Sequence, residues 1–224
     1  MTAIGGERGR FELRLESGTV EARRVLLCTG MIDELPELDG FRELWGASIF
    51  QCPYCHGWEV QDQAFGLLSP NAEMLEFSLL LRGWSRSVVV LTDGRYPVPS
   101  EAATRMASAG IGLDERRLAR LSGRPKLEAV EFTSGAPLKL DVLFARPPQQ
   151  QVALVRTLGL SLDSAGYVQI DPVQRETSIP GIYAAGDLVT PQQAAILAAA
   201  SAMQAAAALN HALSSELATS GGLP

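Results

Sequence analysis

The sequence predicts an α/β fold, and three patterns in it lead to that prediction. A β-α-β unit spans 64–91, with apolar strands at 64–68 and 88–91 around a helical run at 72–82. A continuously apolar strand, 25–28, ends in Thr29-Gly30. A later segment runs into Gly186-Asp187 and is followed by an alanine-rich helix reaching about Leu213. Strands that alternate with helices are typical of a parallel sheet.

The remaining elements are expected to be short. Phe11–Leu15 alternates apolar and polar residues, a turn follows at 16–18, and a second strand runs through 20–27. We expect a hairpin turn at the glycine-rich stretch 5–9, a helix at 100–110, and β pieces at 127–133 and 138–144. Residues 215–224 are expected to form a frayed tail.

Composition excludes several classes of protein. The 224 residues carry 19 Lys plus Arg against 25 Asp plus Glu, and this acidic balance argues against a nucleic-acid binder. There is no polybasic run for an anionic membrane surface. The apolar stretch Ala194–Leu209 is mostly alanine and falls short of ~20 strongly apolar residues, so no membrane span is expected. With three cysteines and no signal-peptide pattern, the expected location is the cytoplasm.

The segment C-P-Y-C-H-G at 52–57 carries the most chemistry. A C-x-x-C pair in a reducing compartment indicates redox chemistry or metal binding more often than a structural bridge. Cys52 and Cys55 can cycle between dithiol and disulfide with little backbone movement. Half of a zinc site is the alternative, with Cys28, His56 and His211 as the other soft ligands, but no second C-x-x-C exists. Redox chemistry is therefore favoured, and no metal is expected.

Other residues near these motifs have plainer interpretations beside the functional ones. His56 could act as a general base, because an imidazole titrates near neutral pH, or it could cap the local turn. Glu59 is interpreted as a solvated acid. Cys28, in an apolar strand, is expected to be an inert core cysteine. Gly186-Asp187 could be an ordinary strand-to-helix turn with a capping Asp, or the approach to a bound ligand.

Taken together, Thr29-Gly30, Cys52-x-x-Cys55, the β-α-β unit and the sequence A-A-G-D at 184–187 stand in the order found in the thioredoxin reductase family of flavoproteins. The chain resembles the C-P-Y-C-H-G branch of that family, which includes FAD-dependent dithiol oxidases, from about Phe11 to Leu213. The resemblance implies a two-domain, Rossmann-like FAD/NAD(P)-binding flavoprotein fold and a homodimer.

The resemblance also implies roles for single residues. Cys55 would exchange electrons with the flavin, Cys52 would meet the outside dithiol or disulfide, and His56 would carry a proton. The residues implied in FAD binding are Thr29, Gly30, Gly186, Asp187, Gln193 and Ala194.

The chain departs from the family pattern at two places. The first FAD-binding βαβ segment, with its G-x-G-x-x-G, is missing from this sequence. The second departure lies in the β-α-β unit, where family reductases carry G-x-G-x-x-A for NADPH. Here the turn reads S-P-N-A-E-M at 69–74, without a glycine and with Pro70 removing an N–H. Arg95 alone is a weak substitute for the arginine-rich segment that binds the 2′-phosphate, and NADPH use is therefore not expected.

We divide the chain accordingly. Residues 1–35 and 146–224 are expected to be the two parts of the FAD domain, and 36–145 an NAD(P)-binding-like domain that carries the C-x-x-C. The expected function is FAD-dependent oxidation of a small-molecule or protein dithiol through a Cys52–Cys55 disulfide. One alternative is an NADPH-dependent disulfide reductase acting on a thioredoxin-like protein. The other is a truncated, flavin-free interaction or regulatory module, against which the intact C-x-x-C-H argues.

Overall fold

The computed structural model describes residues 1–221 and divides the chain into two compact units. The terminal unit consists of Met1–Glu34 together with the chain from Gln149 onward, and the central unit is Leu35–Pro148. These bounds lie close to the expected divisions at 35/36 and 145/146. The assignment of one unit to FAD and the other to a nicotinamide nucleotide stays a prediction.

The central unit is built on a five-stranded parallel sheet in the order β6-β13-β7-β8-β9. Its strands are β6 (Ile49–Phe50), β7 (Phe65–Leu68), β8 (Val88–Leu91), β9 (Gly112–Asp114) and β13 (Val142–Ala145). All four residues of β13 are buried, as expected for a strand covered on both faces. The chain leaves β7 toward β8 and returns to its other side at β13. This reversal is the switch point at which open α/β sheets bind ligands.

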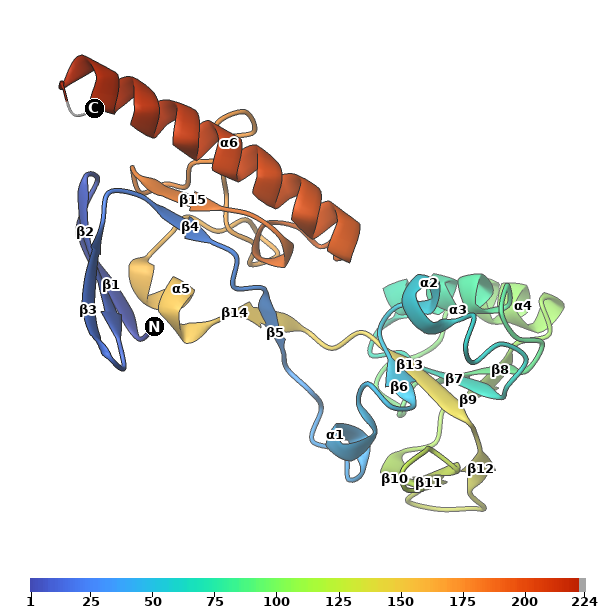
Figure 1. Ribbon diagram of the computed structural model, residues 1–224. Helices are drawn as coiled ribbons and strands as arrows, with labels where there is room; N and C mark the ends of the chain where they lie inside the picture. Colours follow the sequence, from blue (N-terminus) through green and yellow to red (C-terminus); the bar gives the residue numbers. More distant parts are fainter. Residues whose placement is uncertain (222–224) are drawn as a thin grey trace. The chain divides into compact units, whose positions relative to one another are not determined.

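Helices cover one face of this sheet and a small antiparallel sheet covers the other. Helices α3 (Glu76–Leu81) and α4 (Ser100–Ser108) lie on one side in Figure 1. The strands β10 (Leu118–Ser122), β11 (Ala129–Phe132) and β12 (Leu138–Lys139) lie on the other with α1 (Phe41–Leu44). Two separate apolar cores result, one under α3 and α4 and one under β10–β12.

The terminal unit contains three small sheets. An antiparallel meander consists of β1 (Ala3–Glu7), β2 (Arg10–Leu15) and β3 (Gly18–Ala22). A parallel pair consists of β4 (Val25–Leu27) and β15 (Ile182–Ala184), and an antiparallel pair of β5 (Met31–Asp33) and β14 (Gln149–Gln151). Helix α5 (Ala153–Leu158) adds Val155 to the core of this unit, beside Phe11 of β2 and Leu27 of β4.

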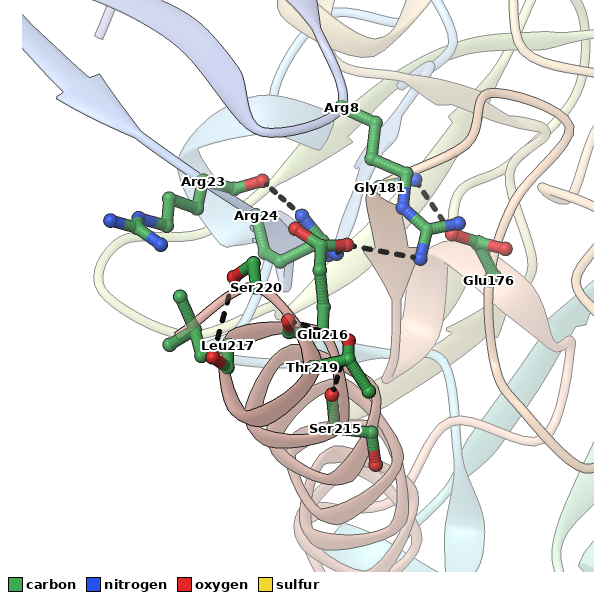
Figure 2. A network of polar contacts seen from close by, with 10 residues as sticks. All are labelled: Arg8, Arg23, Arg24, Glu176, Gly181, Ser215, Glu216, Leu217, Thr219 and Ser220. Carbon is green, nitrogen blue, oxygen red and sulfur yellow. Dashed lines mark hydrogen bonds and ion pairs between the residues drawn. The ribbon is translucent and has the colours of Figure 1, made fainter. Parts of the chain in front are cut away.

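The long helix α6 (Ala195–Thr219) contacts β15 and is anchored at its C-terminal end by a buried arginine. The side chain of Arg24 is only 2% exposed and lies 2.5 Å from the carboxylate of Glu216. Arg8 adds a second contact to the same carboxylate at 3.4 Å. Figure 2 shows these side chains converging on the last turns of the helix. The helix therefore continues past Ser215, and the expectation of a frayed tail from that residue is wrong through Thr219.

Three other expectations need correction. The glycine-rich stretch belongs largely to β1, with the hairpin turn at Arg8-Gly9. The strand expected over 20–27 is two strands in different sheets, broken at Arg23-Arg24, where the Arg24 side chain is buried against Glu216. The helix expected over 72–82 begins as the 3-10 turn η1 (Ala72–Leu75) before α3.

The sequence led us to expect no stretch apolar enough to cross a membrane, and helix α6 differs from that expectation. By length and composition alone it is apolar enough to cross a membrane, with only 6% of its most apolar stretch buried. Ile196 and Met203 are 77% and 67% exposed on it. Seven residues apart, these two side chains lie on the same face of the helix.

Candidate functional site

The C-x-x-C pair opens the short helix α2 (Pro53–His56) in the central unit. Cys52 is the residue before the first helical turn, Pro53 starts that turn, and the N–H groups of Cys55 and His56 both donate to the Cys52 carbonyl oxygen at 3.3 Å. This single turn brings the two cysteine side chains together. Cys52 is partly buried, Cys55 is exposed, and both are free thiols.

The two thiols interact directly. A hydrogen bond with Cys52 raises the pKa of Cys55, and partial burial and the nearby Glu59 carboxylate raise it further. Cys55 therefore holds its proton more tightly than an isolated thiol does.

His56 stands next to the pair, and an aromatic stack fixes its ring. The imidazole is exposed and lies over Phe50 of β6, with ring centroids 4.5 Å apart and the planes inclined by 23°. Phe50 is 8% exposed and belongs to the core under α3 and α4. The stack therefore holds the exposed His56 ring against a residue of the core and restricts its rotation. Glu59 is exposed, in agreement with its interpretation as a solvated acid.

The glycines and the aspartate implied in FAD binding meet in the terminal unit. A pocket of about 320 Å³ lies where the parallel strands β4 and β15 end, and Gly30, Gly186 and Asp187 line it. Three alanines of α6 complete its wall, Ala198, Ala199 and Ala202. Thr29, Gln193 and Ala194 are not among the lining residues of this pocket.

The lining fits part of a flavin nucleotide. Gly186 has φ = 83°, and its N–H donates to the Ser201 hydroxyl at 2.8 Å, which ties the end of β15 to α6. Alanine side chains leave the pocket wide, and Asp187 offers a half-exposed carboxylate to ligand hydroxyls. The volume lies at the low end of the ~300–1,000 Å³ of small-molecule sites. These residues would hold one part of FAD, and no element described here supplies the G-x-G-x-x-G phosphate loop.

Cys28 contradicts its predicted role as a core residue. It is exposed and lines the same pocket, beside Gly30 and Ala185. Partial burial raises the pKa of its thiol. The apolar strand ends at Leu27, one residue earlier than the sequence pattern suggested, and this places Cys28 at the pocket rather than in the core.

Gln193 takes part in a side-chain network that sequence reasoning missed. Its amide nitrogen donates to the Gln149 amide oxygen at 2.6 Å, and the Gln149 amide nitrogen donates to Asp33 at 2.7 Å. The pairing of β5 with β14 brings Asp33 opposite Gln149. No sequence pattern marks this pairing, because the two strands are three residues each and more than a hundred residues apart.

Hydrogen bonds within the protein already occupy polar groups at the turn after β7 and at the end of β8. The side-chain oxygen of Asn71 accepts the N–H of Met74 at 3.1 Å, and the Ser69 hydroxyl bonds the Tyr96 hydroxyl at 2.8 Å. At the end of β8, Asp93 accepts from Arg95 at 3.0 Å and from the Leu118 N–H at 2.7 Å. Within residues 1–221, no group of three or more His, Cys, Asp or Glu could hold a metal ion.

Comparison with known proteins agrees with this geometry. The family model of the pyridine nucleotide-disulphide oxidoreductases matches residues 2–212. The chain belongs to this family. Thioredoxin reductase sirT of Leptosphaeria maculans is 26% identical over 92% of the chain, which spans 68% of that protein. The chain spans 52% to 66% of four other curated relatives.

Two solved structures are similar over nearly the whole chain. The crystal structure of HlmI matches with a TM-score of 0.86 and 33% sequence identity. The match covers 97% of this chain and 70% of the HlmI chain. The thioredoxin reductase TrxB structure from Bacillus anthracis has a TM-score of 0.86 and 30% identity, with coverage of 96% and 74%. The family confirms the expected Rossmann-like fold and an enzyme class, FAD-dependent oxidoreductases that act on disulfides.

Proposed function

We propose that this protein is a thiol-disulfide oxidoreductase that oxidises dithiols through a Cys52–Cys55 disulfide. The observation that carries the proposal is the position of both thiols on the single turn that opens α2, where Cys52 acts on the pKa of Cys55, with His56 adjacent. Either sulfur can reach the other without refolding, and this is what a cycling redox pair needs. The physiological substrate would be a small-molecule or protein dithiol.

The reaction follows from the roles of the two sulfurs. A substrate thiolate attacks Cys52 of the oxidised pair, a substrate–Cys52 bond forms, and Cys55 leaves and takes a proton. The second substrate thiolate attacks the mixed disulfide, releasing the substrate disulfide and the Cys52 thiolate. His56, held by Phe50, accepts the proton of the incoming thiol. The protein ends as a dithiol and holds the two electrons that the substrate lost.

FAD, when bound, would take these two electrons from the dithiol and pass them to an external acceptor. The residues that would hold one part of it are Gly30, Gly186 and Asp187, around the pocket at the ends of β4 and β15. Gln193 and Ala194, before α6, and Thr29 are proposed as further contacts. Gln149 and Asp33 would keep the Gln193 side chain in one orientation.

We further propose that the protein does not exchange electrons with NADPH, and that another acceptor takes them. Three features support this. The turn at 69–71 has no glycine, the Asn71 side chain already uses the Met74 N–H that a phosphate would need, and Asp93 already binds Arg95. The reductase direction is the second candidate, because several relatives are named thioredoxin reductases, and its partner would be a thioredoxin-like protein.

The test compares two electron donors on one protein. Protein loaded with FAD is mixed without oxygen with either a dithiol or NADPH, and the flavin absorbance is followed. We expect rapid bleaching by the dithiol and none by NADPH or NADH. Bleaching by NADPH at a rate comparable to the dithiol would overturn the proposed direction and favour the reductase. We propose a location in the cytoplasm as well, since three cysteines are too few for a disulfide-stapled secreted protein.

A further inference from the structure

Two aromatic side chains flank Cys55 and stand out from the rest of the molecule. Tyr54 precedes it and Trp58 follows three residues later, and each is 74% exposed. Within residues 1–221 they are the only strongly exposed aromatic side chains, because every other Phe, Tyr and Trp is buried or half-buried. Large rings are normally buried, since they contribute most to a core. Their position beside the redox pair therefore points to a ligand.

The Tyr54 ring is held rather than free. It meets Trp84 edge to face, with ring centroids 5.3 Å apart and planes at 87°. Gly57 permits this arrangement, because a Cβ at that position would come within 2.6 Å of the Trp84 indole. The backbone of the C-x-x-C turn thus lies directly on Trp84, and Trp84 supports Tyr54 from the side. Such support lowers the entropy cost of stacking a ligand on the exposed ring.

The charge of the segment around the C-x-x-C pair limits the class of ligand that the two rings would bind. From Gln51 to Gln61 the only formal charge is the Glu59 carboxylate, and the sequence there contains no Lys or Arg. That carboxylate also raises the pKa of Cys55. A negative group beside the reacting sulfurs disfavours anionic thiols, and two exposed rings favour a flat partner.

We propose that Tyr54 and Trp58 form the surface that binds the substrate body, and that this body is planar, unsaturated and uncharged. The rings would stack on the substrate while its sulfurs reach the cysteine pair. The inference rests on the proposed function and adds a substrate class to it. Stacking of this kind contributes roughly a 3- to 10-fold preference over an aliphatic body of similar size.

The test uses thiol-disulfide exchange and needs no flavin. Reduced protein reacts with one of two uncharged probes, the aromatic 4,4′-dithiodipyridine or the aliphatic bis(2-hydroxyethyl) disulfide. A cysteine thiolate attacks the probe, one probe thiol leaves, and the second cysteine displaces the other. One Cys52–Cys55 disulfide and two probe thiols result. The Cys28→Ser background is used throughout, because Cys28 is exposed and would also react.

The measured quantity is the ratio of the two second-order rate constants, compared among variants. The difference in reactivity of the probes themselves is the same for every variant and cancels. Trp58→Leu and Tyr54→Leu should lower the aromatic-to-aliphatic ratio roughly 3- to 10-fold. Trp58→Phe and Tyr54→Phe keep a ring and should retain most of the ratio. Val173→Ala, at a residue 82% exposed in the terminal unit, should leave it unchanged.

The outcomes separate the two proposals. If the wild-type pair closes with both probes and the Leu variants keep the wild-type ratio, the aromatic surface is wrong and the redox pair stands. If neither probe closes a Cys52–Cys55 disulfide, the proposed function itself is wrong. Circular dichroism of each variant confirms that the fold is retained, and the exposed positions of both rings make that the expected result.

Discussion

The raised pKa of Cys55 predicts the order in which the two sulfurs react. Cys55 is the more exposed of the pair, and exposure alone would make it the nucleophile. The hydrogen bond with Cys52 raises the pKa of Cys55, however, and a raised pKa leaves less thiolate at neutral pH. Since the thiolate is the reactive form, the partly buried Cys52 should react first.

Alkylation measures this order. Reduced protein is treated at pH 7 with less than one equivalent of iodoacetamide, and the modified positions are located by mass spectrometry. We expect Cys52 to be labelled several-fold faster than Cys55. Cys52→Ala removes the hydrogen-bond partner, so the remaining Cys55 thiol should become reactive at lower pH. Faster labelling of Cys55 in the wild type would reverse the roles assigned to the two residues.

Single residues also mark the limit of sequence reasoning. The C-x-x-C-H cluster was predictable because its chemistry depends on neighbours along the chain. The place of Cys28 was not, because it depends on where an apolar strand ends, and one residue decides between core and pocket. The Gln149–Gln193 contact could not be found either, since it joins residues 44 positions apart through a pairing of two very short strands.

At the scale of elements, α6 depends on the Arg24–Glu216 pair. Glu216→Gln would leave the buried Arg24 guanidinium without its counter-charge, and unpaired buried charges are costly. We expect a fall in Tm of roughly 5 °C at pH 7, measured by calorimetry. Glu12→Gln removes an exposed carboxylate from β2 and should leave Tm almost unchanged.

The pH dependence of this effect has a definite sign. Arg24 lowers the pKa of Glu216 below its ordinary value of 4.5. The folded state therefore gains stability from the ionised carboxylate above that value and loses it as the pH falls through the lower, folded-state pKa. The difference in Tm between wild type and Glu216→Gln should be constant from pH 6 to 8 and shrink below pH 4.5. A difference that grows in acid would contradict the pairing.

Long elements were easier to predict than short ones. The β-α-β unit of the central domain and the alanine-rich helix were expected from apolar runs and are present. The C-terminal limit of α6 was missed, because the residue that extends it, Arg24, lies 192 positions away along the chain. The strand expected over 20–27 breaks at this same residue. Tertiary contacts of this kind override local pattern.

At the scale of the whole molecule, the exposed face of α6 leads to a prediction of dimerisation. Ile196 and Met203 share one side of the helix, and the long run of small residues around them lets another helix approach closely. We propose that a second copy of the chain covers this face. Light scattering after gel filtration should give twice the chain mass of 24.0 kDa.

Negative charges introduced on the exposed face of α6 test the predicted dimer. The double variant Ile196→Asp with Met203→Asp should give the mass of one chain and retain the wild-type circular dichroism spectrum. Val173→Asp, at another exposed apolar residue, should leave the dimer intact. A wild type that is monomeric, or that is recovered only with detergent or lipid vesicles, would contradict the dimer and direct attention to the membrane-like length of α6.

The proposed function requires the Cys52–Cys55 pair to carry electrons out of a dithiol. The most direct measurement is consumption of a dithiol by FAD-loaded protein in air, with wild type and Cys55→Ser compared at equal flavin content. We expect Cys55→Ser to lose turnover by a factor of 100 or more, on the order of what removing one essential catalytic group costs. We expect Cys28→Ser to keep most of the turnover. Unchanged turnover in Cys55→Ser would show that electrons bypass the pair, and the proposed function would be wrong.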